Sequence, residues 1–314
     1  MCVMVGDILD NKKFLTYEQQ IKKLLDKKLE INNPEEALKL LKKYSYFNLI
    51  NGYKAPFKGN DGNYKKGTSI RDIYSLFTFD DELRHILMKY ILIVELNVKS
   101  LLSYSFCEKF GEEQNEYQNA LNYNYTPNNQ KAINDLIQHL VLQMTNAQQK
   151  VSYVEHQATK HHNIPLWVLV KTLSFGQISK MYSLQQDSIK SKITKEMPRV
   201  RENQLSIMLD ILSRYRNVCA HNERLFDFKY KRSRLKTTTI HKHFNLYTDG
   251  PSPSNLFDVM IFLKLLLTEN EFLSFAKEFE DKLQTLSKAT NQIQKSLLLR
   301  LMGFPQNWKE IIDL

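Results

Sequence analysis

Residues 202–221 read Glu-Asn-Gln-Leu-Ser-Ile-Met-Leu-Asp-Ile-Leu-Ser-Arg-Tyr-Arg-Asn-Val-Cys-Ala-His. Within this stretch, large or apolar side chains recur at the spacing of one helix face: Leu205, Met208, Leu209, Leu212, Tyr215 and Cys219. The pattern predicts a helix with one buried side. Asn222 can adopt the left-handed conformation that ends many helices, so we expect the helix to end near His221.

The same periodicity continues along most of the chain. A long helix is expected from about residue 69 to 110, where an apolar stripe includes Leu83, Leu87, Tyr90, Ile91, Val94, Val98, Leu101 and Leu102. Thr16 and Pro34 mark the starts of two earlier helices. With only nine glycines and eight prolines in 314 residues, the chain has too few turn residues for a β-sandwich or barrel. The sequence therefore predicts an all-α protein.

One segment departs from this pattern. Residues 111–135 are rich in asparagine, glutamine and tyrosine, and we expect a surface loop or insertion there. Two or three further helices are expected towards the C-terminus, over about 256–268, 270–286 and 291–301.

The charge of the chain indicates a class of partner. There are 44 Lys and Arg residues against 34 Asp and Glu residues, a net charge of +10 with neutral histidines. Such an excess attracts polyanions, of which nucleic acid is the commonest, although a simply solvated basic surface fits the count equally well. Five of these cations lie in one run of eight residues: Lys229, Lys231, Arg232, Arg234 and Lys236. This run either follows a phosphate backbone or is a solvated linker.

Other features narrow the setting of the protein. The three cysteines, Cys2, Cys107 and Cys219, lack the spacing of a zinc site or a disulfide framework, which favours a reducing compartment. The first residues lack a basic region followed by a signal-length apolar core, and charged residues interrupt the apolar stretches elsewhere. We therefore expect a cytoplasmic protein with no membrane contact, no bound metal and no cofactor.

The end of the quoted helix carries the residues of most chemical interest, Arg216-Asn217-Val218-Cys219-Ala220-His221. Metal-free RNA cleavage requires a group that moves protons and a fixed cation at one phosphate. Histidine, with an ordinary pKa of about 6.5, performs the first task near neutral pH. Arginine stays charged and can donate two hydrogen bonds to phosphate oxygens. Arg216, Asn217 and His221 are therefore the candidate catalytic residues.

The helix geometry restricts how these side chains meet. Asn217 and His221 are four residues apart and share a face, whereas Arg216 and His221 diverge by roughly 140° at about 100° per residue. Their convergence requires Arg216 to reach around the helix or the helix to end near His221. The plain alternative is a histidine that complements the helix dipole beside a solvated arginine.

Several segments, in their order along the chain, resemble the Abi-like group (AbiD/AbiF) of phage-defence proteins, over roughly residues 15–308. The first is Tyr46-Phe47-Asn48-Leu49-Ile50-Asn51-Gly52-Tyr53-Lys54-Ala55-Pro56-Phe57, and the second runs from Phe79-Asp80-Asp81-Glu82-Leu83-Arg84 to Val94-Glu95-Leu96. The others are Pro165-Leu166-Trp167 with Ser174-Phe175-Gly176, then residues 216–222, and finally Met302-Gly303-Phe304-Pro305-Gln306-Asn307-Trp308.

This resemblance implies membership of the HEPN superfamily, all-α proteins whose ribonuclease members use an R-x(4–6)-H motif without a metal. It implies RNA cleavage in abortive infection or a toxin–antitoxin system. HEPN enzymes often carry an E-x-x-x-K/R element on an earlier helix, which Glu95-Leu96-Asn97-Val98-Lys99 matches. Glu95 and Lys99 would then support Arg216 or His221, and the alternative is an ordinary surface pair at i,i+4 spacing.

These observations define the expected organisation. Residues 1–66 form an N-terminal helical region, 67–228 an HEPN-like helical bundle that carries the motif, and 229–314 a C-terminal helical region. The expected function is a metal-independent endoribonuclease in phage defence. The alternative is a non-catalytic protein that holds a structured noncoding RNA. Because the chain has one such motif, a homodimer is the simplest way to bring two histidines to one RNA strand.

Overall fold

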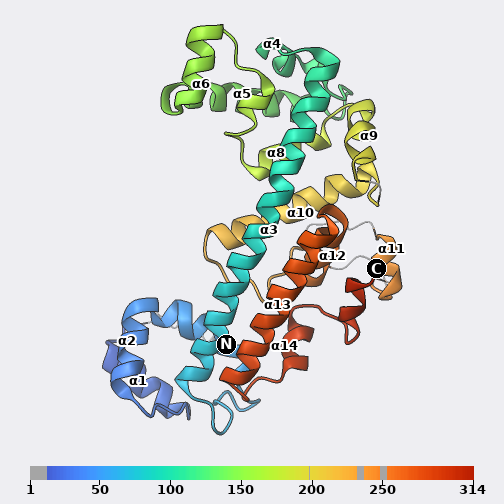
Figure 1. Ribbon diagram of the computed structural model, residues 1–314. Helices are drawn as coiled ribbons and strands as arrows, with labels where there is room; N and C mark the ends of the chain where they lie inside the picture. The colour runs from blue at the N-terminus through green and yellow to red at the C-terminus, as the bar shows by residue number, and fades with distance from the viewer. Residues whose placement is uncertain (1–12, 198, 232–236, 248–252) are drawn as a thin grey trace, which may run out of the picture. The chain divides into compact units, whose positions relative to one another are not determined.

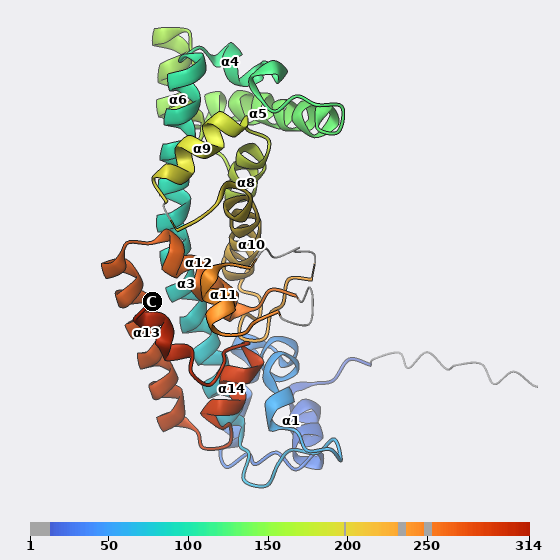
Figure 2. The same ribbon diagram turned by 90° about the vertical axis from the view of Figure 1, so that its right-hand side faces the viewer.

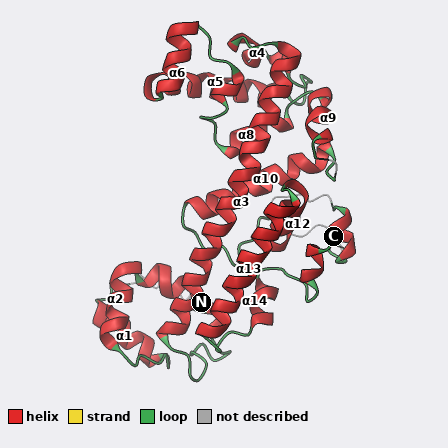
Figure 3. Ribbon diagram, in the orientation of Figure 1, coloured by secondary structure: helices red, strands yellow, loops and turns green. Residues whose placement is uncertain are grey.

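The computed structural model describes residues 13–197, 199–231, 237–247 and 253–314. Helices account for the regular structure of these residues, as expected, and Figure 3 shows no strand among them. Three isolated β-bridges are present, including one between Lys58 and Tyr64. The chain divides into two compact units, residues 1–79 with 284–295, and residues 80–283 with 296–314. The three-region division expected from the sequence stays a prediction.

The first unit contains two capped helices, α1 (Tyr17–Asp26) and α2 (Pro34–Tyr44), which pack against each other. Thr16 is the N-cap of α1 and Pro34 is the first residue of α2, as the sequence predicted. Two short helices follow, at Tyr46–Asn51 and Ala55–Phe57. Tyr53 is buried, and its ring lies edge-on to Phe77 at the start of the long helix.

The long helix is α3 (Ile70–Phe110), labelled in Figure 1, and its bounds match the expected ones closely. Ser69 caps its start: the Ser69 hydroxyl accepts a hydrogen bond from the backbone N–H of Asp72 and donates one to the Asp72 carboxylate. Gly111, with a φ of +95°, follows its last residue and supplies the left-handed conformation that ends the helix. Residues 70–79 of α3 belong to the first unit and residues 80–110 to the second.

In the second unit, α10 (Glu202–Ala220) packs along α8 (Phe175–Ser183), and also contacts α9 (Asp187–Lys195) and α12 (Leu256–Leu266). Figure 2 shows α8 and α10 following one another beside α3. A short helix, α7 (Leu166–Leu169), precedes α8. Ser174 is the N-cap of α8 and forms a capping box with Gln177. The buried residues of α10 include the predicted Leu205, Met208, Leu209, Leu212 and Tyr215.

The segment expected as a loop is more ordered than predicted. It contains α4 (Gln114–Gln118), a short helix at Ala120–Asn122 and the start of α5 (Gln130–Lys150). Tyr117 and Tyr123 are buried, and the Tyr117 hydroxyl donates a hydrogen bond to the carbonyl oxygen of Ile164 at 2.8 Å. Most of the segment lies at the surface, but the expectation of a loop was wrong, since it forms helices whose buried tyrosine and asparagine side chains have partners for their polar atoms. Beyond α5 lie α6 (Ser152–His156) and a short helix at Gln157–His161.

The C-terminal helices bury a further core. Every residue of α12 is buried, and α11 (Thr239–His243), α13 (Glu269–Ala289) and α14 (Lys295–Leu301) complete the series, with a last short helix at Trp308–Ile312. The buried carboxylate of Asp258 lies 3.2 Å from the ring of His241 and accepts the hydroxyl of Tyr247. Gly303 has a φ of +87° and lies against the side chain of Asn255, where a Cβ atom would collide. None of the helices in the described part of the chain has the length and apolar character that crossing a bilayer requires.

A buried ion pair joins α3 to the chain that leaves α10. The carboxylate of Asp80 receives hydrogen bonds from the guanidinium of Arg84 at 2.7 Å and from the backbone N–H groups of Leu225 and Phe226 at 3.0 and 2.7 Å. Arg84 also donates to the carbonyl oxygen of Glu223, at 3.3 Å. Both side chains are almost fully buried, so these contacts fix the residues that follow His221 against α3.

Replacement of Asp80 by alanine should destabilise the fold strongly. The change leaves the buried Arg84 charge without its main partner and leaves two backbone N–H groups without an acceptor, a loss of about 3–5 kcal/mol in the free energy of unfolding. The matched control is Asp81→Ala, since Asp81 pairs with the same arginine but its side chain is 39% exposed. It should cost less than about 1 kcal/mol. Urea unfolding monitored by circular dichroism measures both, and equal losses would contradict the role given to Asp80.

Candidate functional site

The end of α10 is a complete helix-terminating motif. His221 occupies the C-cap position, and its backbone N–H donates to the carbonyl oxygen of Asn217 at 2.9 Å. Asn222 has a φ of +57°, and the N–H groups of Asn222 and Glu223 donate to the carbonyls of Cys219 and Val218. This is the Schellman arrangement, and it confirms the helix end predicted at Asn222.

The three candidate catalytic residues differ in their surroundings. The side chains of Asn217 and His221 are exposed, and the His221 imidazole has no hydrogen-bond or ion-pair partner among the described residues. Arg216 lies on a different side of α10, with its side chain 29% exposed and facing Glu95 of α3. The structure thus presents an open imidazole at the helix end and an arginine held partly in the protein.

Glu95 and Lys99 lie where they can position Arg216. Glu95 forms an ion pair with Lys99 at 2.7 Å, and its other oxygen, Oε2, lies 3.7 Å from Nε of Arg216. Lys99 also donates to the carbonyl oxygen of Leu173, at 2.8 Å, which attaches the pair to the segment before α8. The Glu95 and Lys99 side chains are only 8% and 13% exposed, so they are not the solvated surface pair that the spacing alone allows.

The contact between Glu95 and Arg216 is electrostatic and loose. At 3.7 Å it is too long for a hydrogen bond, and both facing atoms are buried without a hydrogen-bond partner in the described residues. Buried polar atoms in this condition are uncommon and often occur at functional sites. Since Nε is buried, the exposed part of the Arg216 side chain lies elsewhere, and it remains available to an anion.

Cys219 lies inside the motif but is a poor nucleophile. Burial raises the pKa of its thiol to about 12, and Asp80 adds to that effect while Arg84 opposes it. At neutral pH the thiol is therefore protonated, whereas nucleophilic attack requires the thiolate. Cys219 is therefore not the candidate nucleophile of the motif.

The basic run after the motif is described only in part. Lys229 and Lys231 are exposed, whereas Arg232, Arg234 and Lys236 lie outside the described residues. Tyr230, inside the run, pairs with Ser254 through backbone hydrogen bonds of 2.9 and 3.1 Å. Contact of the run with RNA stays a prediction.

Sequence reasoning missed two contributors to this site. One is the pair of Asp80 and Arg84, which the sequence analysis treats only as part of a segment that resembles the Abi-like group. An acid and an arginine at i,i+4 spacing on a long apolar helix could have indicated a structural pair. The other is a groove bordered by Asn217, in which α5 contributes His139. No cluster of His, Cys, Asp or Glu that could hold a metal ion is found within the described ranges.

Comparison with known families shows the family of the chain. The fold and site define an all-α protein with an exposed histidine and a partly buried arginine at one helix end. A family model described as Abi-like protein matches residues 39–227, a range that includes Asp80, Glu95 and all of the motif. The chain belongs to the Abi-like family, which associates it with abortive infection and phage defence. No curated protein and no solved structure matches it.

Proposed function

We propose that this protein is a metal-independent endoribonuclease of the HEPN class that acts in abortive infection or a toxin–antitoxin system. The observation that carries the proposal is the end of α10, where exposed His221 follows Arg216 by five positions and Arg216 faces the buried carboxylate of Glu95. The net charge of +10 supports an RNA substrate. We further propose that it acts in the cytoplasm, a reducing compartment that suits its cysteines.

The chemistry assigns one task to each residue. The 2′-hydroxyl of the substrate loses a proton and its oxygen attacks the adjacent phosphorus, while the bond from phosphorus to the 5′-oxygen breaks and that oxygen gains a proton. The products are a 2′,3′-cyclic phosphate and a 5′-hydroxyl. His221 accepts or supplies one of these protons. Arg216 binds the phosphate and stabilises the negative charge of its transition state, and the Asn217 amide orients the nearby RNA.

Glu95 acts through Arg216 and does not touch the substrate. Its charge attracts the guanidinium to one side of α10, and Lys99 holds Glu95 in turn. A guanidinium held in advance loses less conformational entropy when it binds a phosphate, so more of the binding energy remains for the transition state. Both residues are therefore positioning residues.

Substitution of His221 or Arg216 should abolish cleavage. Because the two residues act on one transition state, His221→Ala, Arg216→Ala and the double variant should each lose on the order of 10³-fold or more in cleavage rate, with similar residual rates. Purified protein is incubated with RNA in EDTA, and the product ends are identified by mass spectrometry. Cyclic phosphate ends from the wild type alone are expected.

Two outcomes would contradict this assignment. Undiminished cleavage by His221→Ala would remove histidine from the mechanism, and 5′-phosphate products that require Mg²⁺ would indicate a different reaction. Tight binding of RNA by a wild type that never cuts would instead favour the alternative function, a protein that holds a noncoding RNA. The control is an unchanged circular dichroism spectrum for each variant, which the exposure of His221 makes reasonable.

We also propose that the active form is a homodimer. Cleavage benefits from both a base and an acid, and one chain supplies a single His221 at the motif. A surface suited to a second copy lies on α3, where Leu92 and Leu96 are 42% and 70% exposed and share one face at i,i+4 spacing. Leu96 is next in sequence to Glu95. A twofold contact there would place two copies of the site close together.

A mixed dimer distinguishes a shared site from independent sites. One wild-type subunit and one His221→Ala subunit, with different affinity tags, are co-expressed and isolated as the mixed species. A shared site predicts activity far below half of the wild-type value, because each reaction needs both histidines. Retention of about half the activity would show that each subunit cuts alone.

A further inference from the structure

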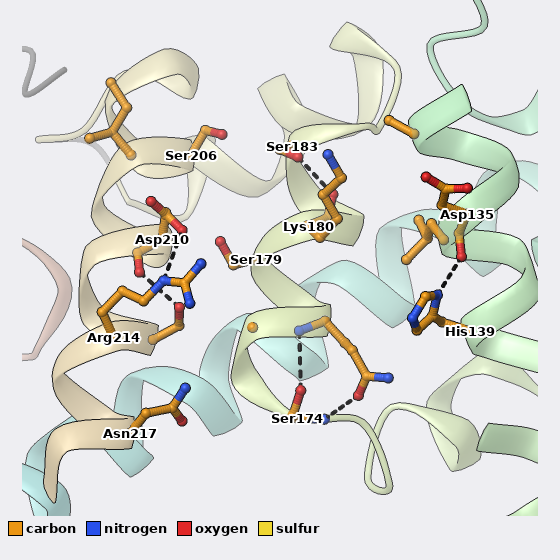
Figure 4. A pocket seen from close by; sticks show the side chains of 16 residues that line it. Asp135, His139, Ser174, Ser179, Lys180, Ser183, Ser206, Asp210, Arg214 and Asn217 are labelled. Carbon is orange, nitrogen blue, oxygen red and sulfur yellow. Dashed lines mark hydrogen bonds and ion pairs between the residues drawn. The ribbon is translucent and has the colours of Figure 1, made fainter. Parts of the chain in front are cut away.

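A groove whose lining residues are mostly of polar type lies beside the motif. It is lined by α5, α8 and α10 and has a volume of about 710 Å³. This volume is within the typical range of about 300–1,000 Å³ for sites that bind small ligands. Figure 4 shows α8 in the middle, with the labelled residues of α10 on one side and those of α5 on the other. One end of the groove is bordered by Asn217 of the motif.

The side of α10 that lines this groove leads directly to His221. Ser206, Asp210, Arg214 and Asn217 all line it, and they follow one another at the spacing of a single helix face. His221 is four residues beyond Asn217, about 40° away around the helix and about 6 Å further along its axis. A chain that lies in the groove therefore reaches the exposed imidazole one helical turn later.

The charges of the groove suit a nucleotide more than a simple anion. Lys180 of α8 is exposed and has no ion-pair partner in the described part of the chain. Arg214 lies 3.9 Å from Asp210, and its guanidinium covers the ring of Tyr230 at 5.7 Å. The Asp210 carboxylate also accepts the Tyr230 hydroxyl, at 3.3 Å. Two cations can contact a phosphate, while acceptors nearby can receive the amino and hydroxyl hydrogens of a base and a ribose.

His139 of α5 adds an aromatic surface to the opposite wall. Its Nδ1 lies 2.6 Å from the backbone carbonyl oxygen of Asp135. Because that oxygen can only accept, Nδ1 carries a hydrogen, and the other side of the ring is directed towards the groove in Figure 4. An exposed imidazole ring is one of the surfaces on which unpaired bases stack.

We propose that this groove binds one unpaired nucleotide of the RNA substrate, next to the phosphate that is cut. Lys180 and Arg214 contact its phosphate, and His139 stacks on its base. The inference rests on the proposed function for the identity of the substrate, but its test measures binding and does not require cleavage. The groove would thus select single-stranded RNA, since a paired base cannot leave its helix without losing its partner.

The test uses a short fluorescein-labelled single-stranded RNA and full-length protein that carries His221→Ala, so that the probe stays intact. Lys180→Ala with Arg214→Ala in this background should weaken binding about tenfold at low salt. It should also flatten the slope of log K against log salt by about 0.7, the contribution of one phosphate contact on a single strand. The matched control is Lys150→Ala with Lys160→Ala, which removes two exposed cations outside the groove lining.

Each result decides the proposal. A loss confined to the groove variant, together with cross-links from a 4-thiouridine probe to peptides of α8 or α10, would support it. Equal effects of the groove and control variants would overturn it, even if the wild type cuts RNA. If the groove variant alone loses affinity but the wild type never cuts, the nuclease proposal fails and the groove remains a nucleotide-binding site.

Discussion

Two buried carboxylates on α3 control the end of α10. Asp80 binds the backbone of Leu225 and Phe226 and holds Arg84, which in turn reaches the carbonyl oxygen of Glu223. Glu95, four turns further along α3, faces Arg216. A helix end is usually the least constrained part of a helix, because its last carbonyl groups lack partners within the helix. Here the residues before and after His221 are both tied to α3, which gives the imidazole a defined position although its side chain is exposed.

This arrangement explains why the site combines an open group with a restrained one. A residue that exchanges protons with RNA must be reached by the substrate, and His221 is exposed. A cation that stabilises a transition state is more effective when it is oriented in advance, and Arg216 is partly buried beside an acid. The groove between α5, α8 and α10 extends the same principle to the substrate, because it would hold a nucleotide along the helix face that leads to His221.

Much of the fold followed from local patterns in the sequence. Apolar periodicity predicted α3 and α10. Thr16 and Pro34 predicted the starts of two helices, and Asn222 predicted the end of another. These features could be predicted because helix formation and capping depend on residues that are neighbours in the sequence. Contacts between side chains on different helices were harder to predict from the sequence. The i,i+4 spacing of Glu95 and Lys99 fitted a surface pair as well as a site, and only the position of α10 places Arg216 beside them. Likewise, nothing local to His139 or Lys180 indicates that α5 and α8 bring them to one groove. The burial of Tyr117 was missed because its hydroxyl finds its partner, the carbonyl oxygen of Ile164, far away in sequence.

We propose that the charge of Glu95 positions Arg216 for catalysis. The most direct measurement compares the RNA cleavage rates of Glu95→Gln and Glu108→Gln, with RNA affinity and melting temperature measured for both. Glu108 lies on the same helix but is exposed and pairs with Lys192 at the surface. Glu95→Gln should lower kcat by about tenfold or more, equivalent to about 1.4 kcal/mol of transition-state stabilisation, with RNA affinity little changed. Glu95→Asp should restore part of that loss, and Glu108→Gln should stay within about twofold of the wild type. Equal cleavage rates for Glu95→Gln and Glu108→Gln, in folded proteins, would contradict the positioning role of Glu95.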